Sequence, residues 1–254
     1  MKFSGKIFFL LLLCNQSYGQ QILFRNYSVI DGLCSNTVWS ISQDDKGYMW
    51  FGTKNGLNRF DGYEFKSYQF DKENKYSIGN NFIHVICKYD NKNYWIGTED
   101  GIYNLNLEDE KFTRVPVAVN NLVYDIIRDT KGILWVATKN NGLYSYNPGN
   151  NKTKQFTQGS PNSESLSLNQ IRKLAEDSRG RIWIGTFGEG IDVLDPSTLK
   201  IINYKTQSTG GDVNSNKIIT LYKDLQGNMW AGTLGGLKVW QKNTDSFKIY
   251  QKGG

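Results

Sequence analysis

The chain has 254 residues, of which 14% are aromatic, and it holds 26 glycines against 4 prolines. This length can bury a sizeable core, and many ring residues interrupted by glycines favour a multi-stranded sheet protein with tight turns. The formal net charge is +6, but the basic residues are scattered among acidic ones, which argues against a nucleic-acid interface. With one histidine and no Cys-x-x-Cys spacing, the sequence indicates neither a metal site nor another cofactor.

The first 19 residues have the pattern of a secretory signal peptide. Lys2 and Lys6 form a positive start, residues 7–14 are an unbroken apolar run, and the small residues Ser17 and Gly19 precede the predicted cleavage site. The apolar run is far shorter than the roughly 20 residues that cross a bilayer as a helix, although an uncleaved anchor remains the alternative. We therefore predict a periplasmic mature chain, residues 20–254, with a net charge of +4 once the two lysines are removed and with no membrane span.

A repeat organises the rest of the chain. Tryptophans recur at intervals of 45, 40, 48 and 47 residues, each with an asparagine 14 residues before it and a threonine three residues after it. The tryptophans are Trp50, Trp95, Trp135, Trp183 and Trp230; the threonines are Thr53, Thr98, Thr138, Thr186 and Thr233; the asparagines are Asn36, Asn81, Asn121, Asn169 and Asn216. Five copies with fixed offsets predict five consecutive copies of one structural unit.

The first copy indicates what this unit is. Residues 38–43 alternate between apolar and polar, a four-residue turn follows, and residues 48–53 form a second strand that contains the tryptophan. Further strands are expected at residues 57–60 and 64–70. Four short antiparallel strands in 40–48 residues are typical of a β-propeller blade, so we predict an all-β fold of five blades.

The turn before each tryptophan has its own signature, Asp-x-x-Gly. The aspartate can cap the turn and the glycine can adopt positive φ. The second copy departs from the signature, with Tyr89 and Lys92 at these positions. A glycine between the tryptophan and the threonine, as at Gly52, is expected to let a neighbouring sheet approach closely.

A spare outer strand is predicted before the first blade. Phe24-x-x-Tyr27 repeats the Phe65-x-x-Tyr68 signature of the fourth strand, yet the fifth blade ends with its own copy of that signature. A closed ring of five blades would need no spare strand, whereas in a larger ring such a strand would complete the last blade. We therefore expect the five blades to belong to a larger ring.

The string Asn-x-Val/Ile … Asp-x-x-Gly-x-x-Trp-x-Gly-Thr-x-x-Gly-Leu resembles the two-component regulator propeller repeat. Its fullest match is residues 44–60, which read DDKGYMWFGTKNGLNRF. The opening Phe24-x-x-Tyr27 … Asp31-Gly32-Leu33 is similar to the mature N-terminus of sensors in that family.

Members of this family combine a periplasmic sensor of two seven-bladed propellers with an immunoglobulin-like linker, one membrane helix, and histidine kinase and receiver domains, and many sense oligosaccharides. The resemblance thus implies part of a seven-bladed ring in a signal-transduction sensor. The kinase of the family has no counterpart in these residues, so no catalysis is expected from them.

Candidate binding residues should differ between otherwise equal blades. The repeated tryptophans and threonines are expected to serve packing, because every blade holds them. The residue three after each asparagine should lie near the mouth of the central channel; this set is Trp39, His84, Tyr124, Arg172 and Ile219. Aromatic rings, an imidazole and a guanidinium suit sugar recognition, which makes Trp39, His84, Tyr124 and Arg172 the predicted ligand site. The alternative is that these side chains merely line the channel.

Other readings stay open at this point. A sialidase-like carbohydrate-active enzyme is one, although His84 has no nucleophile motif beside it, and a protein-interaction propeller is another. Polar residues of the loops between second and third strands, such as Glu99 and Asp100, are expected to be solvated. A homodimer through the propeller edges is a further expectation, and the positions of Cys34 and Cys87 favour free thiols over a disulfide.

Overall fold

The computed structural model describes residues 24–160, 162–205, 213–241 and 246–250. The predicted signal peptide, residues 1–19, lies outside the described residues. No helix in the described residues is long and apolar enough to span a membrane.

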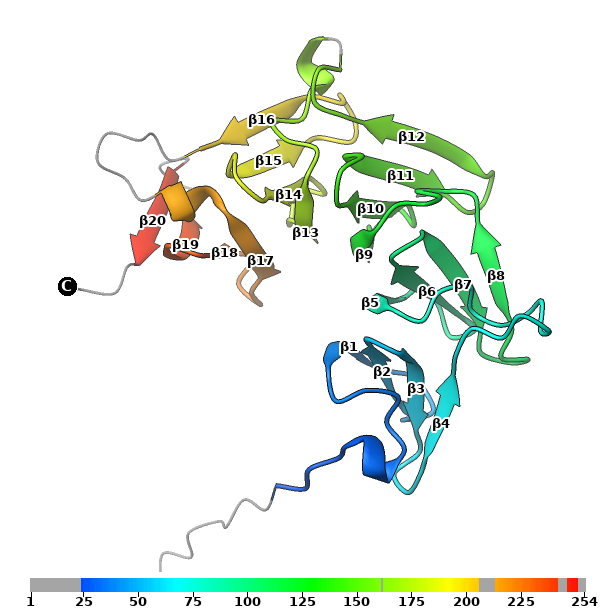
Figure 1. The fold of residues 1–254 in the computed structure, drawn as a ribbon. Coiled ribbons are helices and arrows are strands. Elements are labelled where there is room, and N and C mark those ends of the chain that lie inside the picture. The colour runs from blue at the N-terminus through cyan, green and yellow to red at the C-terminus, as the bar shows by residue number, and fades with distance from the viewer. Residues whose placement is uncertain (1–23, 161, 206–212, 242–245, 251–254) are drawn as a thin grey trace, which may run out of the picture.

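Five four-stranded antiparallel sheets follow one another along an arc (Figure 1). In each sheet the spatial order of the strands is their order in the sequence, and the first strand lies nearest the centre of the arc. This arrangement confirms the all-β propeller architecture predicted from the repeat.

The strand bounds follow in chain order. Blades 1 and 2 contain β1 (Val38–Gln43), β2 (Met49–Thr53), β3 (Gly56–Phe60), β4 (Phe65–Tyr68), β5 (Ile83–Lys88), β6 (Asn93–Thr98), β7 (Ile102–Asn106) and β8 (Phe112–Val115). Blades 3 and 4 contain β9 (Val123–Arg128), β10 (Leu134–Thr138), β11 (Leu143–Asn147), β12 (Lys152–Phe156), β13 (Ile171–Glu176), β14 (Ile182–Thr186), β15 (Ile191–Leu194) and β16 (Ile201–Tyr204). Blade 5 contains β17 (Ile218–Lys223), β18 (Met229–Thr233), β19 (Gly236–Gln241) and β20 (Ser246–Tyr250). Short 3₁₀ helices η1 (Val29–Asp31), η2 (Asn162–Glu164) and η3 (Val213–Asn216) lie in the segments before blades 1, 4 and 5.

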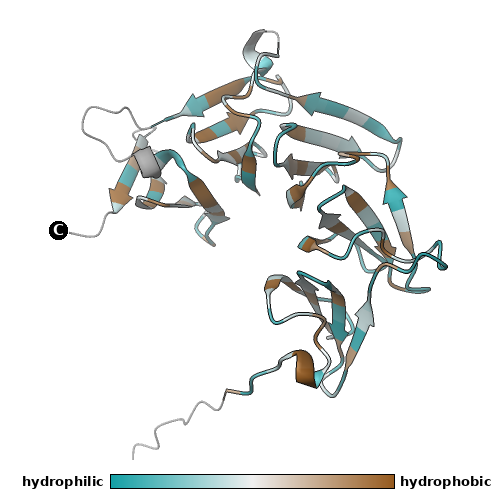
Figure 2. Ribbon diagram, viewed as in Figure 1, coloured by the Kyte–Doolittle hydropathy of each residue, from teal (hydrophilic) through white to brown (hydrophobic). Residues whose placement is uncertain are grey.

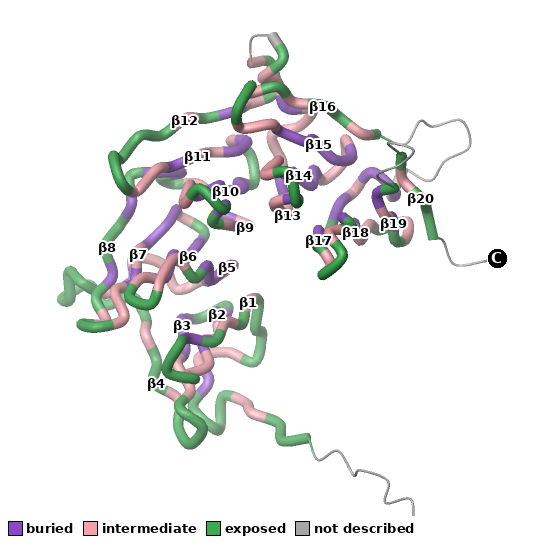
Figure 3. The backbone as a smooth tube through the Cα atoms, turned by 180° about the vertical axis from the view of Figure 1, so that it is seen from behind, coloured by how far each residue is buried: buried purple, intermediate pink, exposed green. Residues whose placement is uncertain are grey.

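The hydrophobic core lies between neighbouring blades. Between blades 1 and 2, for example, Trp50 and Leu57 pack against Ile83 and Ile96. Apolar segments recur in every blade (Figure 2), and the outermost strands are more exposed than the strands between them and the centre (Figure 3). Because each sheet buries a face against its neighbour, the core is a series of layers rather than one cluster.

In blades 1 and 4 the glycine two residues after the tryptophan lets the next blade approach closely. A Cβ added to Gly52 would lie 2.7 Å from Cγ2 of Ile83 in the next blade, and one added to Gly185 would lie 2.6 Å from Cγ2 of Ile218. The expected close approach of the neighbouring sheet is therefore confirmed at these positions. Blade 3 tolerates Ala137 at the equivalent place.

The Asp-x-x-Gly turn does more than reverse the chain. Asp129 accepts hydrogen bonds at Oδ1 from the backbone amides of Lys131 and Ile133, and at Oδ2 from Trp135 Nε1 at 2.8 Å. The same aspartate-to-indole bond joins Asp44 to Trp50, Asp177 to Trp183 and Asp224 to Trp230. In blade 2 Tyr89 replaces the aspartate, and Trp95 Nε1 is buried without a hydrogen-bond partner in the described residues.

The arc is open between blades 5 and 1 (Figures 1 and 3). Ile41 of blade 1 is 59% exposed, whereas its counterpart Ile86 in blade 2 is 8% exposed. At the other end Leu237 is 40% exposed, whereas its counterpart Leu57 in blade 1 is fully buried. Blades 1 and 5 therefore each expose an apolar face, and the equivalent face is covered wherever another blade follows or precedes. The number of blades in a closed ring stays a prediction.

The spare strand predicted at Phe24–Tyr27 was wrong as a strand, because these residues join no sheet. Their position nevertheless follows the repeat. Val29 donates its amide hydrogen to Asn36 Oδ1, as Phe70 does to Asn81 at the same offset from its own Phe-x-x-Tyr. A strand needs a neighbouring backbone to pair with, and Tyr27 instead packs its ring on the face of blade 1, 4.9 Å from the ring of Phe60.

Both described cysteines are free thiols, as favoured from the sequence. Cys87 is buried in the layer between blades 2 and 3, while Cys34 is only half-buried. Burial raises the pKa of the Cys87 thiol to about 12.

Candidate functional site

Each innermost strand carries a β-bulge at the same repeat position. In blade 1 Val38 pairs with Thr53 and Ser40 pairs with Gly52, so Trp39 between them has no partner. The other four blades show the same register shift. The five bulged residues are Trp39, His84, Tyr124, Arg172 and Ile219. A bulge turns a side chain out of the regular alternation of the strand. The sequence analysis predicted these five residues near the channel but did not predict the bulge.

These five side chains line one central cavity of about 330 Å³. The residue that follows each of them completes the lining, a row that the sequence analysis did not single out: Ser40, Val85, Asp125, Lys173 and Thr220. The two rows differ in chemistry from blade to blade, whereas no repeated tryptophan or threonine of the described chain lines this cavity.

Ring contacts connect the bulged residues across the blades. The imidazole of His84 stacks on Phe82 with centroids 4.3 Å apart and lies 5.7 Å from the ring of Trp39. Its other neighbour, Tyr124, approaches edge-on at 5.8 Å. Arg172 then lies over the Tyr124 ring at 4.3 Å, so the series runs without interruption from blade 1 to blade 4.

The second row joins neighbouring blades. Asp125 is almost fully buried; it pairs with Lys173 Nζ at 2.9 Å and accepts the amide hydrogen of Leu174 at 2.8 Å. Ser40 plays the equivalent part in blade 1, where its Oγ accepts the amide hydrogen of Ile86 at 3.0 Å. Lys173 is therefore a positive group with a carboxylate partner inside the protein.

His84 is a neutral imidazole near pH 7. Its side chain is 7% exposed, and burial together with the nearby charge of Arg172 lowers its pKa to about 4. Nε2 is buried and has no hydrogen-bond partner among the described residues; Oε1 of Glu99 lies 4.0 Å away.

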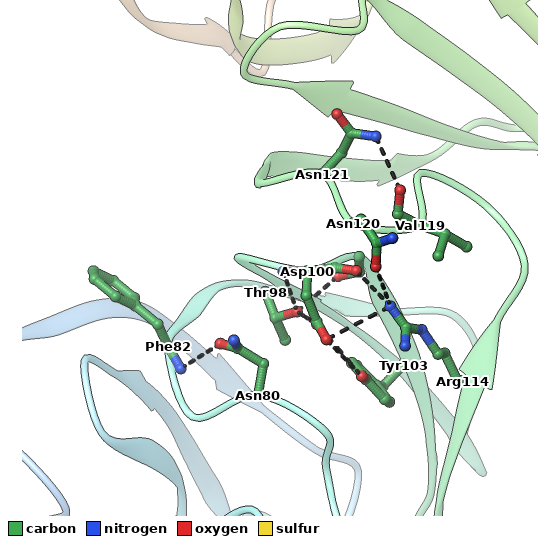
Figure 4. Close-up of polar contacts among 10 residues, drawn as sticks. Asn80, Phe82, Thr98, Asp100, Tyr103, Arg114, Val119, Asn120 and Asn121 are labelled. Atoms are coloured by element: carbon green, nitrogen blue, oxygen red, sulfur yellow. Dashed lines mark hydrogen bonds and ion pairs between the residues drawn. The ribbon is translucent and has the colours of Figure 1, made fainter.

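Glu99 and Asp100 lie in the loop between β6 and β7, and both keep solvent contact as expected, but Asp100 is also partly buried and hydrogen-bonded. Its carboxylate accepts hydrogen bonds from Thr98 Oγ1 at 2.8 Å and from the Tyr103 hydroxyl at 3.2 Å. Arg114 donates to the Asp100 carbonyl at 2.9 Å (Figure 4). The loop beside His84 is thus held by both β7 and β8.

The repeated threonines make the same contact in every blade. Each donates its hydroxyl hydrogen to the carbonyl of the glycine that closes the loop before the third strand, as Thr53 does to Gly56 at 2.8 Å. The other bonds of this kind join Thr138 to Gly142, Thr186 to Gly190 and Thr233 to Gly236, while in blade 2 Thr98 shares its one hydroxyl hydrogen between the Gly101 carbonyl and Oδ1 of Asp100. These contacts and the aspartate-to-indole bonds are made within single blades.

The family model of the two component regulator propeller matches the chain at residues 32–55, 119–140 and 165–188. These spans lie in the regions that lead into and through the first two strands of blades 1, 3 and 4. Blades 1, 3 and 4 are therefore similar to two-component regulator propeller repeats over these spans. The resemblance stated from the sequence is thereby confirmed.

Relatives of this propeller belong to two-component systems. Histidine kinase P4 of Formosa agariphila is 38% identical over 76 residues, which is 30% of this chain and 6% of that protein. The extracellular domain of a hybrid two component system of B. thetaiotaomicron, BT3049, superposes with a TM-score of 0.77 at 26% identity, over 88% of this chain and 31% of its own. The propeller is thus similar to extracellular domains of such systems, and it spans less than a third of either relative.

Virginiamycin B lyase from Staphylococcus aureus also has a similar structure. Its TM-score is 0.63 over 84% of this chain and 69% of that chain, at 14% identity. An identity this low shows a common propeller fold and carries no argument about the reaction.

Proposed function

We propose that this chain is the ligand-sensing propeller region of an exported two-component sensor and that its central cavity binds an oligosaccharide without transforming it. The observation that carries the proposal is the convergence of five non-repeated side chains, one from each blade, on a single cavity. Repeated residues serve the packing that every blade needs. A specific ligand would therefore be recognised by the residues that differ from blade to blade.

The lining suits a saccharide. Trp39 is 54% exposed and offers an aromatic face to the apolar side of a sugar ring. Arg172 supplies a guanidinium for charge-assisted hydrogen bonds, and the volume of about 330 Å³ lies at the small end of ligand pockets. A ligand held here would contact several blades at once, so its binding energy would act on their mutual packing, which is how we expect the signal to begin.

Calorimetric or array screening of oligosaccharides against the chain tests the proposal. A saccharide that binds should lose roughly two- to tenfold in affinity on Trp39→Ala, because a stacked aromatic contributes about 0.5–1.5 kcal/mol to a contact of this kind. Tyr63→Ala is the matched control, since Tyr63 is 92% exposed and lies outside the cavity. Absence of saccharide binding together with capture of a protein ligand would contradict the proposed ligand class.

Two further proposals have their own tests. Turnover of a bound saccharide or of a synthetic glycoside would favour the enzyme alternative over a sensor without catalysis. The predicted homodimer would use the open faces of blades 1 and 5, and sedimentation of the chain over a range of concentrations tests it.

A further inference from the structure

The central cavity holds one cation without an acidic partner. Arg172 lies over the rings of Tyr124, at 4.3 Å, and Phe187, at 4.9 Å, and it makes no ion pair among the described residues. Lys173 beside it is paired with the buried Asp125. The planar guanidinium is therefore held by two rings while its fork of donors, which matches a carboxylate, remains available.

His84 lies within the field of that cation. The groups packed against the imidazole are Phe82 from its own blade, Trp39 from β1, Tyr124 from β9 and Glu99 from the β6–β7 loop. Of the charged groups around the cavity, Arg172 disfavours the imidazolium, while Lys173 is paired with Asp125, a carboxyl whose pKa is raised by burial. Glu99 is the acid nearest to Nε2, and at 4.0 Å it is beyond hydrogen-bond distance.

We infer that the ligand of this cavity carries an acidic group that binds to Arg172, and that its binding favours protonation of His84 in mildly acidic solution, where the imidazolium pairs with Glu99. The inference rests on the proposed function and names the ligand class of the same site, a saccharide that bears a carboxylate. A carboxylate on Arg172 neutralises the charge that disfavours the imidazolium and adds a negative charge of its own. The proton comes from solvent, and the resulting Nε2–H gains the carboxylate of Glu99 as its acceptor.

The loop that carries Glu99 limits what has to move. Asp100 is bonded to Thr98 and Tyr103, and its carbonyl accepts from Arg114 (Figure 4). Because this backbone is fixed, a change of the Glu99 side chain, which is 46% exposed, is enough to close the remaining distance to Nε2. Ligand charge, imidazole charge and the position of the Glu99 side chain are then coupled across blades 2 to 4.

The chain contains one histidine, so its ring protons report this site alone in an NMR titration. The probes are D-glucuronate and, as the neutral match, D-glucose, each at millimolar concentration. The pKa of His84, about 4 in the free chain, should rise with glucuronate by roughly 1–2 units, the effect of an opposite charge within a few ångströms, and should not move with glucose. By linkage, glucuronate should bind about twofold more tightly at about pH 5 than at about pH 7 if the pKa rises by one unit, and about tenfold more tightly if it rises by two.

Two variants separate the role of the cation that binds the ligand from the role of the carboxylate that pairs with the imidazolium. Arg172→Gln should raise the pKa of His84 in the free chain, because it removes the neighbouring positive charge, and should abolish the further rise with glucuronate. Glu99→Gln should retain glucuronate binding at neutral pH but lose most of its pH dependence, because the imidazolium then lacks its anionic partner.

The failures are distinguishable. If glucuronate perturbs the Trp39 indole signal while the pKa of His84 stays unchanged, the proton coupling is refuted and the proposed function stands. If the saccharides found by screening carry no acidic group, the ligand class inferred here is refuted, again without harm to the proposed function. Absence of any saccharide binding in the cavity overturns both.

Discussion

The second blade provides a natural control for the bond between the turn aspartate and the core tryptophan. Trp135 Nε1 donates to Asp129 at 2.8 Å, whereas Trp95 occupies the same repeat position with Tyr89 in place of the acceptor and an indole N–H left unpaired in the described structure. Both tryptophans are buried, with 3% and 6% exposure. Trp135→Phe and Trp95→Phe therefore remove the same atoms from similar layers. The first substitution breaks a hydrogen bond, whereas the second removes a buried donor that has no acceptor.

The magnitudes follow from that difference. Trp135→Phe removes a hydrogen bond to a charged group, worth roughly 1.5–3 kcal/mol, and leaves a buried carboxylate oxygen without its donor. Trp95→Phe removes a buried donor whose lack of a partner already costs about 1–3 kcal/mol. With the cavity contributions similar, Trp135→Phe should lower the free energy of unfolding by at least about 2 kcal/mol more than Trp95→Phe.

Urea denaturation followed by far-UV circular dichroism measures both variants against the parent chain. Equal destabilisation by the two substitutions would refute the reasoning. It would mean that the repeated aspartate contributes through its turn hydrogen bonds alone, and that the indole contributes only through packing.

Three further predictions concern other parts of the fold. Burial opposes ionisation of Asp177, but hydrogen bonds from the neighbouring indole and backbone amides hold the pKa of its carboxyl below the ordinary value. The stability that Asp177 contributes is therefore present above about pH 4 and is lost as the pH falls through the lowered pKa. The difference in unfolding free energy between the parent chain and Asp177→Asn should shrink between pH 7 and pH 3. Iodoacetamide at pH 8 should modify Cys34 and spare Cys87, whose raised pKa leaves only about one thiol in ten thousand ionised, and peptide mass mapping reads both; equal modification would contradict the burial of Cys87. Gly185→Ala should destabilise by about 1–3 kcal/mol because its Cβ would lie 2.6 Å from Ile218, and an unchanged thermal midpoint would show that the blades can separate at no cost.

The candidate site was predicted in part. Counting three residues from the repeated asparagine selects one side chain from each blade, and the structure places all five around one cavity. The offset is preserved because the bulge recurs at the same position in every inner strand. Sequence reasoning missed the second lining row and the position of Glu99 opposite His84, since neither has a repeated signature.

The strand positions and the number of blades were determined by the sequence itself. Each copy must form its own hairpins, cap its own turn and fill its own layer, and these local needs leave the same residues at the same offsets. The predicted strands 38–43 and 57–60 agree with β1 and β3 to within one residue.

Only the tertiary structure decided which contacts form between blades and what surrounds the cavity. Residues 24–27 have the sequence of an outer strand, but they form none, because a strand exists only where another backbone supplies its partners. The cavity, likewise, is assembled from five side chains separated by 40–48 positions, and its free guanidinium and unpaired imidazole arise from which neighbours the arc brings close. Such properties depend on distances through space, which an intrablade repeat does not encode.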